Sequence, residues 1–424
     1  MISEAIFLVL IAALPVMRPV ILELGRYQLP AADFLFVAAA LSAAVSVVAG
    51  RRTVPLPRIL GWLACYGLAL SLSAILSADR ARSAIKLAGD FYLLALASLV
   101  LFHVRTVDAL RRALLAWIAG AAITVAAAAT AILLFVAGFQ NPYRNPLLSI
   151  HGSLPEGRYP RVMGLFLNPN MYCAYLVASL GITIAAARAG WLRRDAAIGL
   201  GIAIVAAGTF SLSPGLGGML IVFGVAAHGA WTQRHPLLAR AVLALCLLGA
   251  VGALIAITVS PAPGGPFSIA SLRPSSRMLT WIGSIEAFPA HPWFGKGVGL
   301  DVVQIGYRNA SGIYELLTDA HNTWLSILVQ CGVIGLASFV AIVVAVMRGR
   351  GASPAAAPST GVNRQIVSDL ALAFAGGFLY QSLSGSFENT RHVWALIGLL
   401  AAARDIGAAQ ASTACGKPGP PAAT

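Results

Sequence analysis

Charged residues are scarce in this chain of 424 residues, where Asp, Glu, Lys and Arg together make up only 10%. Soluble globular domains carry about 25% charged residues. Hydrophobic residues reach 58% and the mean hydropathy is +0.82. A water-soluble globule is therefore excluded, and the composition predicts a polytopic membrane protein.

Several familiar signals are also missing. The cysteines are scattered, and four of the five lie within apolar runs, so their spacing fits neither a disulfide framework nor a metal site. The N-terminus has no basic region and no small-residue cleavage site, so we interpret it as a retained first span. The net charge of +14 comes with no nucleic-acid-binding motif, and no internal repeat of the kind that builds many transporters is visible.

Long, nearly uncharged runs recur along the chain. A helix needs about 20 apolar residues to cross a membrane, and segments with an alternating apolar pattern are absent. The sequence therefore predicts an all-α fold of about 12 transmembrane helices. The expected spans are 5–24, 31–49, 57–77, 84–104, 113–138, 165–187, 196–212, 214–231, 240–260, 324–346, 367–385 and 390–403.

The connecting segments predict the orientation of these helices. The loops after even-numbered spans are short and basic, which is typical of the cytoplasmic side. The two longest polar connections, 139–164 and 261–323, follow odd-numbered spans and are expected outside the membrane.

The same pattern divides the chain into regions. We expect N-terminal helices in 1–138, a core in 139–346 and a cytoplasmic linker in 347–366. After the linker we expect two C-terminal helices in 367–404 and a disordered tail in 405–424.

The most informative motif is DAHNTWLSILVQCGVIGL at 319–336. Asn322 and Thr323 are good N-cap residues for the span that follows, so simple capping explains them. Capping leaves His321 unexplained, because the partial positive charge at a helix N-terminus disfavours imidazolium. His321 is expected to be neutral at pH 7 and able to accept a proton, as a general base must. Capping and catalysis both remain open on these residues alone.

Cationic residues precede two other expected helices. RYPRVMGLFLNPN (158–170) places Arg161 before the capping signal Asn168-Pro169-Asn170. Arg161 could contact lipid headgroups, or it could bind a phosphate at the helix N-terminus. Arg277 falls in the first turn of an expected amphipathic helix on the membrane surface, which carries Met278, Leu279, Trp281, Ile282, Ile285 and Phe288 as its apolar stripe.

Two further segments have plain explanations. The glycines of GKGVG (295–299) lack the strand and the Lys-Ser/Thr of a nucleotide-binding loop, so tight turns explain them better. SFENTRHVW (386–394) places Glu388, Arg391 and His392 at the edge of the last span, where an interfacial anchor is the more common role.

Taken in order, these motifs resemble those of the O-antigen ligase and Wzy-type polymerase superfamily. RVMGLFLNPN, SSRMLTWIGSIEAFPAHPWFGKGVG and DAHNTWLSILVQCGVIGL match its three characteristic segments over about 161–336. The resemblance implies a GT-C-like membrane fold with a large periplasmic loop between spans 9 and 10. It also implies a metal-independent, inverting glycosyltransferase of the bacterial inner membrane, needing no cofactor, that takes an undecaprenyl-diphosphate-linked glycan as donor.

The resemblance also implies roles for individual residues. His321 would accept or orient the proton of an acceptor hydroxyl, and Arg161, Arg277 and, more weakly, Arg391 would bind the donor diphosphate. Asn168, Asn170 and Asn322 would support the site. The acceptor would be lipid A-core, another glycan repeat or a protein hydroxyl, in lipopolysaccharide or exopolysaccharide biosynthesis.

One position departs from the family pattern. Many members carry a Ser-Arg-Gly turn between spans 7 and 8, whereas this chain reads SLSPGLGG with Pro214 at the arginine position. One phosphate ligand is thus missing or supplied elsewhere. The alternative from a different class is a transporter or flippase of lipid-linked oligosaccharides, against which stand the missing repeat and the gathering of polar residues on one side.

Overall fold

A computed structural model provides the structure of the protein. It describes residues 2–24, 27–54, 57–153, 156–261, 272–308, 314–348, 364–386 and 390–414.

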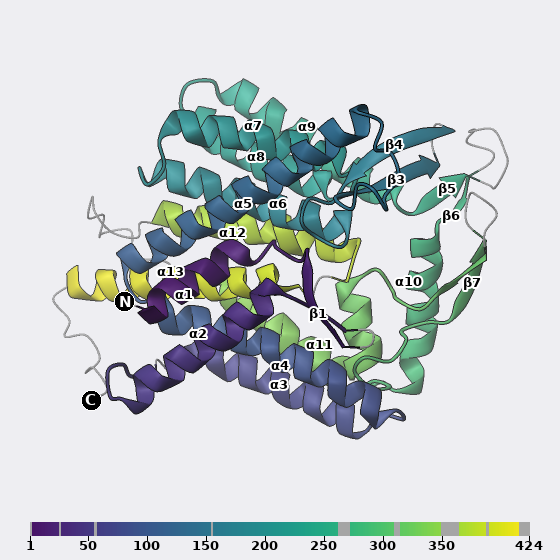
Figure 1. Cartoon of the computed structure of the whole chain (residues 1–424), viewed down its shortest axis with the longest axis horizontal. Helices are drawn as coiled ribbons and strands as arrows, with labels where there is room; N and C mark the ends of the chain where they lie inside the picture. The colour runs from purple at the N-terminus through teal and green to yellow at the C-terminus, as the bar shows by residue number, and fades with distance from the viewer. Residues whose placement is uncertain are drawn as a thin grey trace.

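Helices dominate the described residues (Figure 1). Most begin after a capping or proline residue: Asp79 caps α4, Thr106 caps α5, and Pro169 follows the cap of α6. The helices are α1 (Ile2–Ala13), α2 (Ala31–Val48), α3 (Arg58–Ile75), α4 (Arg80–His103), α5 (Val107–Val136), α6 (Pro169–Arg188), α7 (Arg194–Phe210), α8 (Leu216–Trp231), α9 (Pro236–Ala256), α10 (Ser276–Ala287), α11 (Thr323–Arg348), α12 (Arg364–Phe374) and α13 (Arg391–Ala414).

Nine helices in the described part of the chain are long and apolar enough to cross a membrane. They are α2 to α6, α9, α11, α13, and α12 taken together with the π and 3-10 turns that extend it to Leu383. The helices α7 and α8 coincide with expected spans but have only 17 and 16 residues. The chain is a multi-pass membrane protein, and the count of twelve spans stays a prediction.

The expected first span, 5–24, is wrong in its extent. Helix α1 ends at Ala13, and the chain then continues into the strand Val20–Leu24. Pro15 and Pro19 explain the early end, because proline lacks the N–H that a helix interior requires. At 12 residues, α1 is shorter than a membrane span.

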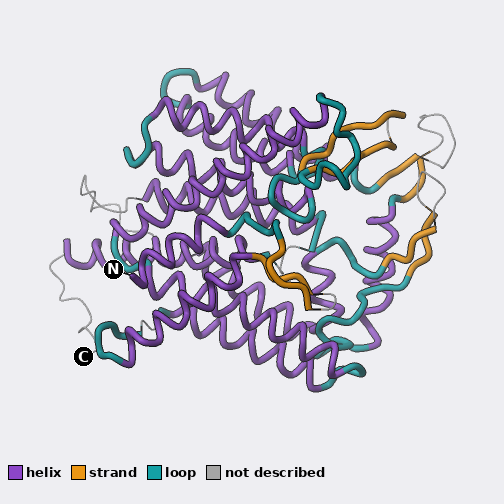
Figure 2. Tube along the Cα trace, viewed as in Figure 1, coloured by secondary structure: helices purple, strands orange, loops and turns teal. Residues whose placement is uncertain are grey.

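Among the described residues, four short antiparallel hairpins lie in the connections and were not expected from the sequence. In Figure 2 the last three lie at the right end of the bundle and the first lies nearer its middle, while the N-terminus lies on the left. Their strands are β1 (Val20–Leu24), β2 (Tyr27–Pro30), β3 (Leu148–Ser153), β4 (Glu156–Val162), β5 (Val259–Pro261), β6 (Leu272–Pro274), β7 (Ile305–Arg308) and β8 (Tyr314–Leu317).

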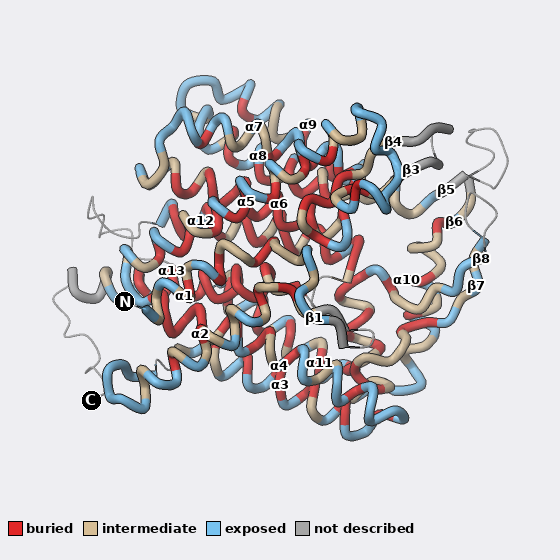
Figure 3. The backbone as a smooth tube through the Cα atoms, viewed as in Figure 1, coloured by how far each residue is buried: buried red, intermediate tan, exposed pale blue. Residues whose placement is uncertain are grey.

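Burial separates central from peripheral helices (Figure 3). The helices α6 and α13 bury most of their residues, whereas α2 and α9 bury few of theirs. Exposed Leu and Val side chains on a helix of this composition face lipid rather than water. Thus α6 and α13 form the interior of the bundle, and the functional side chains described below lie at the N-terminal ends of α6, α10 and α11.

Helix α11 is interrupted inside the bundle. Gly332 adopts φ 67° and ψ −170°, which breaks the helical hydrogen-bond ladder. The freed groups are satisfied by the preceding loop: the N–H of Val333 donates to Pro292 O at 2.9 Å, and the carbonyl of Gln330 accepts from Gly297 N at 3.2 Å. The loop glycines Gly295, Gly297 and Gly299 have positive φ, so the tight turns predicted for GKGVG are confirmed.

The C-terminal regions differ in part from the expected boundaries. Helix α13 continues through Ala414, so residues 405–414 of the expected tail are helical. Within the expected linker, Met347 and Arg348 close α11 and residues 364–366 open α12. Residues 349–363 and 415–424 lie outside the described residues, as does Glu388.

Candidate functional site

Arg161 reaches the site from the C-terminal end of strand β4. Its Nε donates to the carbonyl of Ser211 at 3.0 Å, and its Nη2 donates to Asn170 Oδ1 at 2.9 Å. Asn170 stands in the first turn of α6, which Asn168 caps by accepting from Asn170 N at 2.7 Å. Burial lowers the pKa of Arg161 from its ordinary value, although the group stays charged at neutral pH. The two asparagines therefore hold the guanidinium against the start of α6.

Arg277 lies in the first turn of α10, whose N-cap Ser275 accepts from Met278 N at 3.2 Å. Burial first, and then the nearby charge of Arg161, lower the pKa of Arg277 to about 10. No carboxylate or other hydrogen-bond partner of its guanidinium is found in the described part of the chain. Two arginines thus lie within electrostatic range without a compensating acid between them, and such a pair favours an anionic ligand.

Part of the apolar stripe of α10 faces outward. Ile282 and Ile285 are exposed, while Thr280 and Ser284 are buried and Thr280 Oγ1 donates to the carbonyl of Ala320 at 3.0 Å. This bond joins α10 to the residue before His321. The expected position of α10 on a membrane surface stays a prediction.

His321 immediately precedes the capped start of α11. Its side chain is 46% exposed, and its backbone has φ 49°, in the left-handed region that L-residues rarely adopt. Surrounding protein and the charge of Arg277 lower its pKa from the ordinary value of 6.5, while Asp319 acts in the opposite direction. The imidazole is therefore neutral at pH 7 and accessible, as a proton acceptor must be.

Asp319 is the functional candidate that the sequence reasoning missed. Its Oδ2 lies 3.5 Å from His321 Nδ1, and Ser386 Oγ donates to both of its carboxylate oxygens at 2.8 and 2.9 Å. Ser326 Oγ donates to Oδ1 at 3.2 Å. The two serines fix a carboxylate beside one imidazole nitrogen, which leaves Nε2 for a substrate. An acid two residues before the histidine was the only sequence signal of this role.

Asn322 and Thr323 serve the local structure. The side chain of Asn322 accepts from Trp324 N at 3.0 Å and from Leu325 N at 3.2 Å, so it caps α11. Thr323 Oγ1 donates to Gly385 O at 3.0 Å, which ties α11 to the segment that carries Ser386.

Three helix N-termini converge on this cluster. Arg161 is bonded to the first turn of α6, Arg277 belongs to the first turn of α10, and His321 precedes α11. Each N-terminus carries about half a positive charge from its aligned peptides. Together with the two guanidinium groups they create a strongly positive region, which suits phosphate groups.

Arg391 has its partners outside this cluster. It begins α13, where its guanidinium forms an ion pair with Asp33 at 2.7 Å and its Nε donates to Tyr92 OH at 3.0 Å. These residues line a separate cavity of about 620 Å³ between α2 and α4. Its predicted role as a diphosphate ligand stays a prediction, and would require it to exchange Asp33 for the ligand. The neighbouring His392 is buried between the rings of Phe166 and Tyr175.

The turn that contains Pro214 still belongs to the site. It joins α7 to α8, and its first residue, Ser211, offers the carbonyl that accepts from Arg161. Pro214 itself supplies no cation. The turn therefore contributes an anchor for Arg161 in place of an arginine of its own.

Groups of three or more His, Cys, Asp or Glu side chains placed to hold a metal ion were not found among the described residues. Metal independence of the chemistry stays a prediction.

A family model described as O-antigen ligase matches residues 173–340. This part of the chain is thus similar to the O-antigen ligase family. The match runs from α6 to the second half of α11, and it includes Arg277, Asp319 and His321. Proteins of the O-antigen ligase family are glycosyltransferase-like ligases and polymerases. Searches of curated proteins and of solved structures gave no significant match.

The matched region does not contain every residue of the cluster. Arg161, Asn168 and Asn170 lie just before Cys173, where the match begins. The hydrogen bonds of Arg161 to Asn170 and Ser211 nevertheless attach it to the matched helices.

Proposed function

We propose that the protein transfers a glycan from an undecaprenyl-diphosphate carrier to an acceptor hydroxyl at the periplasmic face of the bacterial inner membrane. The acceptor is lipid A-core or another glycan repeat. The observation that carries this proposal is the accessible, neutral His321 near Arg277, which in turn lies near Arg161, each of the three at the start of a helix. The match of residues 173–340 to the O-antigen ligase family supports the reaction class.

The leaving diphosphate determines the role of the arginines. As the bond between the anomeric carbon and the phosphate oxygen breaks, negative charge grows on that oxygen. Arg277, which has no acid partner in the described protein, and Arg161, which Asn170 and Ser211 orient, lie where such charge would be stabilised. The positive charge of the site comes from guanidinium groups and helix termini, so the proposed reaction needs no metal.

His321 acts on the acceptor. The acceptor hydroxyl transfers its proton to Nε2 as its oxygen forms the new bond to the anomeric carbon, on the face opposite to the departing diphosphate. Configuration at that carbon is inverted. Asp319 faces Nδ1 and stabilises the imidazolium that forms, and Ser386 and Ser326 hold the carboxylate in place.

Asp319 and Arg277 shift the pKa of His321 in opposite directions, so removing each should shift the pH dependence of the rate in opposite directions. A base must be deprotonated, so activity falls as the pH drops through the pKa of His321, which lies below 6.5. Asp319 raises this pKa and Arg277 lowers it. We expect Asp319→Asn to move the acidic limb of the pH–rate profile to lower pH. We expect Arg277→Gln to move the acidic limb, measured on the activity that this variant retains, to higher pH. Limbs that stay unshifted in both variants would contradict the assignment of His321 as the base.

Product analysis in proteoliposomes tests the function itself. The purified protein receives an undecaprenyl-diphosphate glycan with or without lipid A-core, and His321→Ala serves as the control. Transfer only when core is present identifies a ligase, and longer lipid-linked glycans without core identify a polymerase. The absence of any covalent product with either acceptor would refute glycosyl transfer and favour translocation of the lipid-linked glycan.

A further inference from the structure

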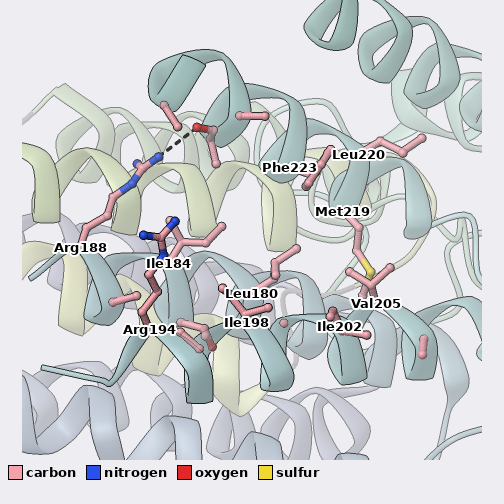
Figure 4. A pocket seen from close by; sticks show the side chains of 18 of the residues that line it. Leu180, Ile184, Arg188, Arg194, Ile198, Ile202, Val205, Met219, Leu220 and Phe223 are labelled. Carbon is pink, nitrogen blue, oxygen red and sulfur yellow. Dashed lines mark hydrogen bonds between the residues drawn. The ribbon is translucent and has the colours of Figure 1, made fainter. Parts of the chain in front are cut away.

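Helices α6, α7 and α8 line an elongated groove (Figure 4), and His321 is not among its lining residues. Its volume is about 1010 Å³, and its lining is almost entirely aliphatic or aromatic. Along α7 the lining extends from Arg194 to Thr209, which at 1.5 Å per residue corresponds to roughly 22 Å. The groove is therefore long enough for extended hydrocarbon chains.

The two ends of the groove differ. At one end Thr209 and Leu216 flank the uncharged turn between α7 and α8. At the other end stand Arg188, Arg194 and Trp231, and Figure 4 shows both arginines together at this end. Tryptophan beside basic residues is typical of the depth at which lipid headgroups lie.

The basic end carries an excess of positive charge. Arg188 is satisfied, since its Nη1 lies 2.6 Å from Asp369 Oδ1 and its Nη2 donates to Ala226 O at 3.0 Å. Arg194 is exposed, and no hydrogen bond or ion pair of its side chain is found in the described part of the chain. Arg193 lies 3.9 Å from Asp195 but does not line the groove. Arg234 follows on the connection from α8 to α9, and Arg240 lies near the start of α9; both add positive charge.

We infer that this groove binds an anionic phospholipid. The acyl chains lie along α6, α7 and α8, and the phosphate lies against Arg194, with Trp231 at headgroup depth. Basic pockets between transmembrane helices are suited to anionic headgroups. The inference is independent of the glycosyl transfer proposed above, because the basic end lies at the other end of the α7 helix from the Ser211 turn that anchors Arg161.

A polyprenyl chain is the competing occupant. Entering from the Ser211 end, it would fill the same apolar walls but would bring its phosphate to Arg161. Arg194 would then remain uncompensated beside a hydrocarbon tail. The charge at the basic end thus favours a lipid whose headgroup lies there.

Native mass spectrometry of the full chain, given equal amounts of phosphatidylglycerol and phosphatidylcholine, tests the inference. We expect wild-type protein to retain phosphatidylglycerol in preference to phosphatidylcholine. Arg194→Gln should weaken that retention about fivefold, the effect of one basic residue near an anionic surface. Arg193→Gln, which removes the same charge one residue away and outside the groove, should leave retention unchanged.

A second variant tests the groove walls. Ile202 lines the groove and is 67% exposed, so Ile202→Trp should fill the space without disturbing the buried core. We expect it to lower retention of both lipids, while the melting temperature shows that the fold is intact. Equal retention by Arg194→Gln and Arg193→Gln would overturn the inference, as would displacement of phosphatidylglycerol by undecaprenyl phosphate in the wild type but not in Ile202→Trp.

Discussion

Replacing His321 by glycine is expected to reduce glycan transfer by about 10² to 10⁴-fold, the usual contribution of a general base, without destabilising the protein. The reason for the second part is the backbone. His321 has φ 49°, and a left-handed conformation costs an L-residue roughly 1–2 kcal/mol that glycine does not incur. Glycine also loses more chain entropy on folding. The two effects oppose each other, so the free energy of unfolding should change by less than about 1 kcal/mol.

Turnover and melting temperature measured on the same preparation separate the two roles of this segment. Asn322→Ala is the matched control, because it removes the cap of α11 and should cost about 1 kcal/mol of stability. His321→Gly should therefore lose activity and keep stability, while Asn322→Ala should lose stability first. If His321→Gly transferred glycan at near wild-type rate, His321 would be a structural residue and the proposed mechanism would be wrong.

Replacing Arg277 by glutamine is expected to lower the turnover number by about 10² to 10³-fold, the effect of removing one group that stabilises transition-state charge. Its guanidinium has no acid partner in the described structure and lies near the like charge of Arg161. Removing it thus breaks no ion pair and relieves a repulsion. The melting temperature should stay the same or rise, which is unusual for a partly buried arginine.

Arg273→Gln provides the control for this experiment. Arg273 lies four residues earlier, where its Nη2 donates to Arg308 O at 2.7 Å and its guanidinium packs over the Tyr307 ring. Its loss should lower stability modestly and leave the turnover number near that of the wild type. Equal losses of turnover in the two variants would mean that Arg277 acts through the loop structure and not on the leaving group.

The helices were predictable from the sequence, whereas the hairpins were not. A run of about 20 uncharged residues has one stable form in lipid, so most expected spans have a counterpart helix. The strands β3 to β8 lie in polar connections, have three to seven residues each, and pair only with their immediate neighbours. Such short hairpins leave no periodic pattern over enough residues to be recognised.

The site was predictable residue by residue but not as an arrangement. Motif position singled out His321, Arg161 and Arg277, and the structure brings them within electrostatic range. The sequence could not indicate that Arg391 is paired with Asp33, more than 300 positions away in the chain. The role of Asp319 depends on Ser386, which belongs to a distant segment. Relations of this kind arise from helix packing, which a single sequence does not specify.

The interruption of α11 at Gly332 has a consequence for biosynthesis. A transmembrane helix with freed backbone groups is costly in lipid until a partner satisfies them. Here the partner is the loop around Pro292 and Gly297, which precedes α11 in the chain. It leaves the ribosome first, so it is available when α11 enters the membrane. The order of these two segments along the gene thus allows the broken helix to complete its hydrogen bonds during insertion, without waiting for residues made later.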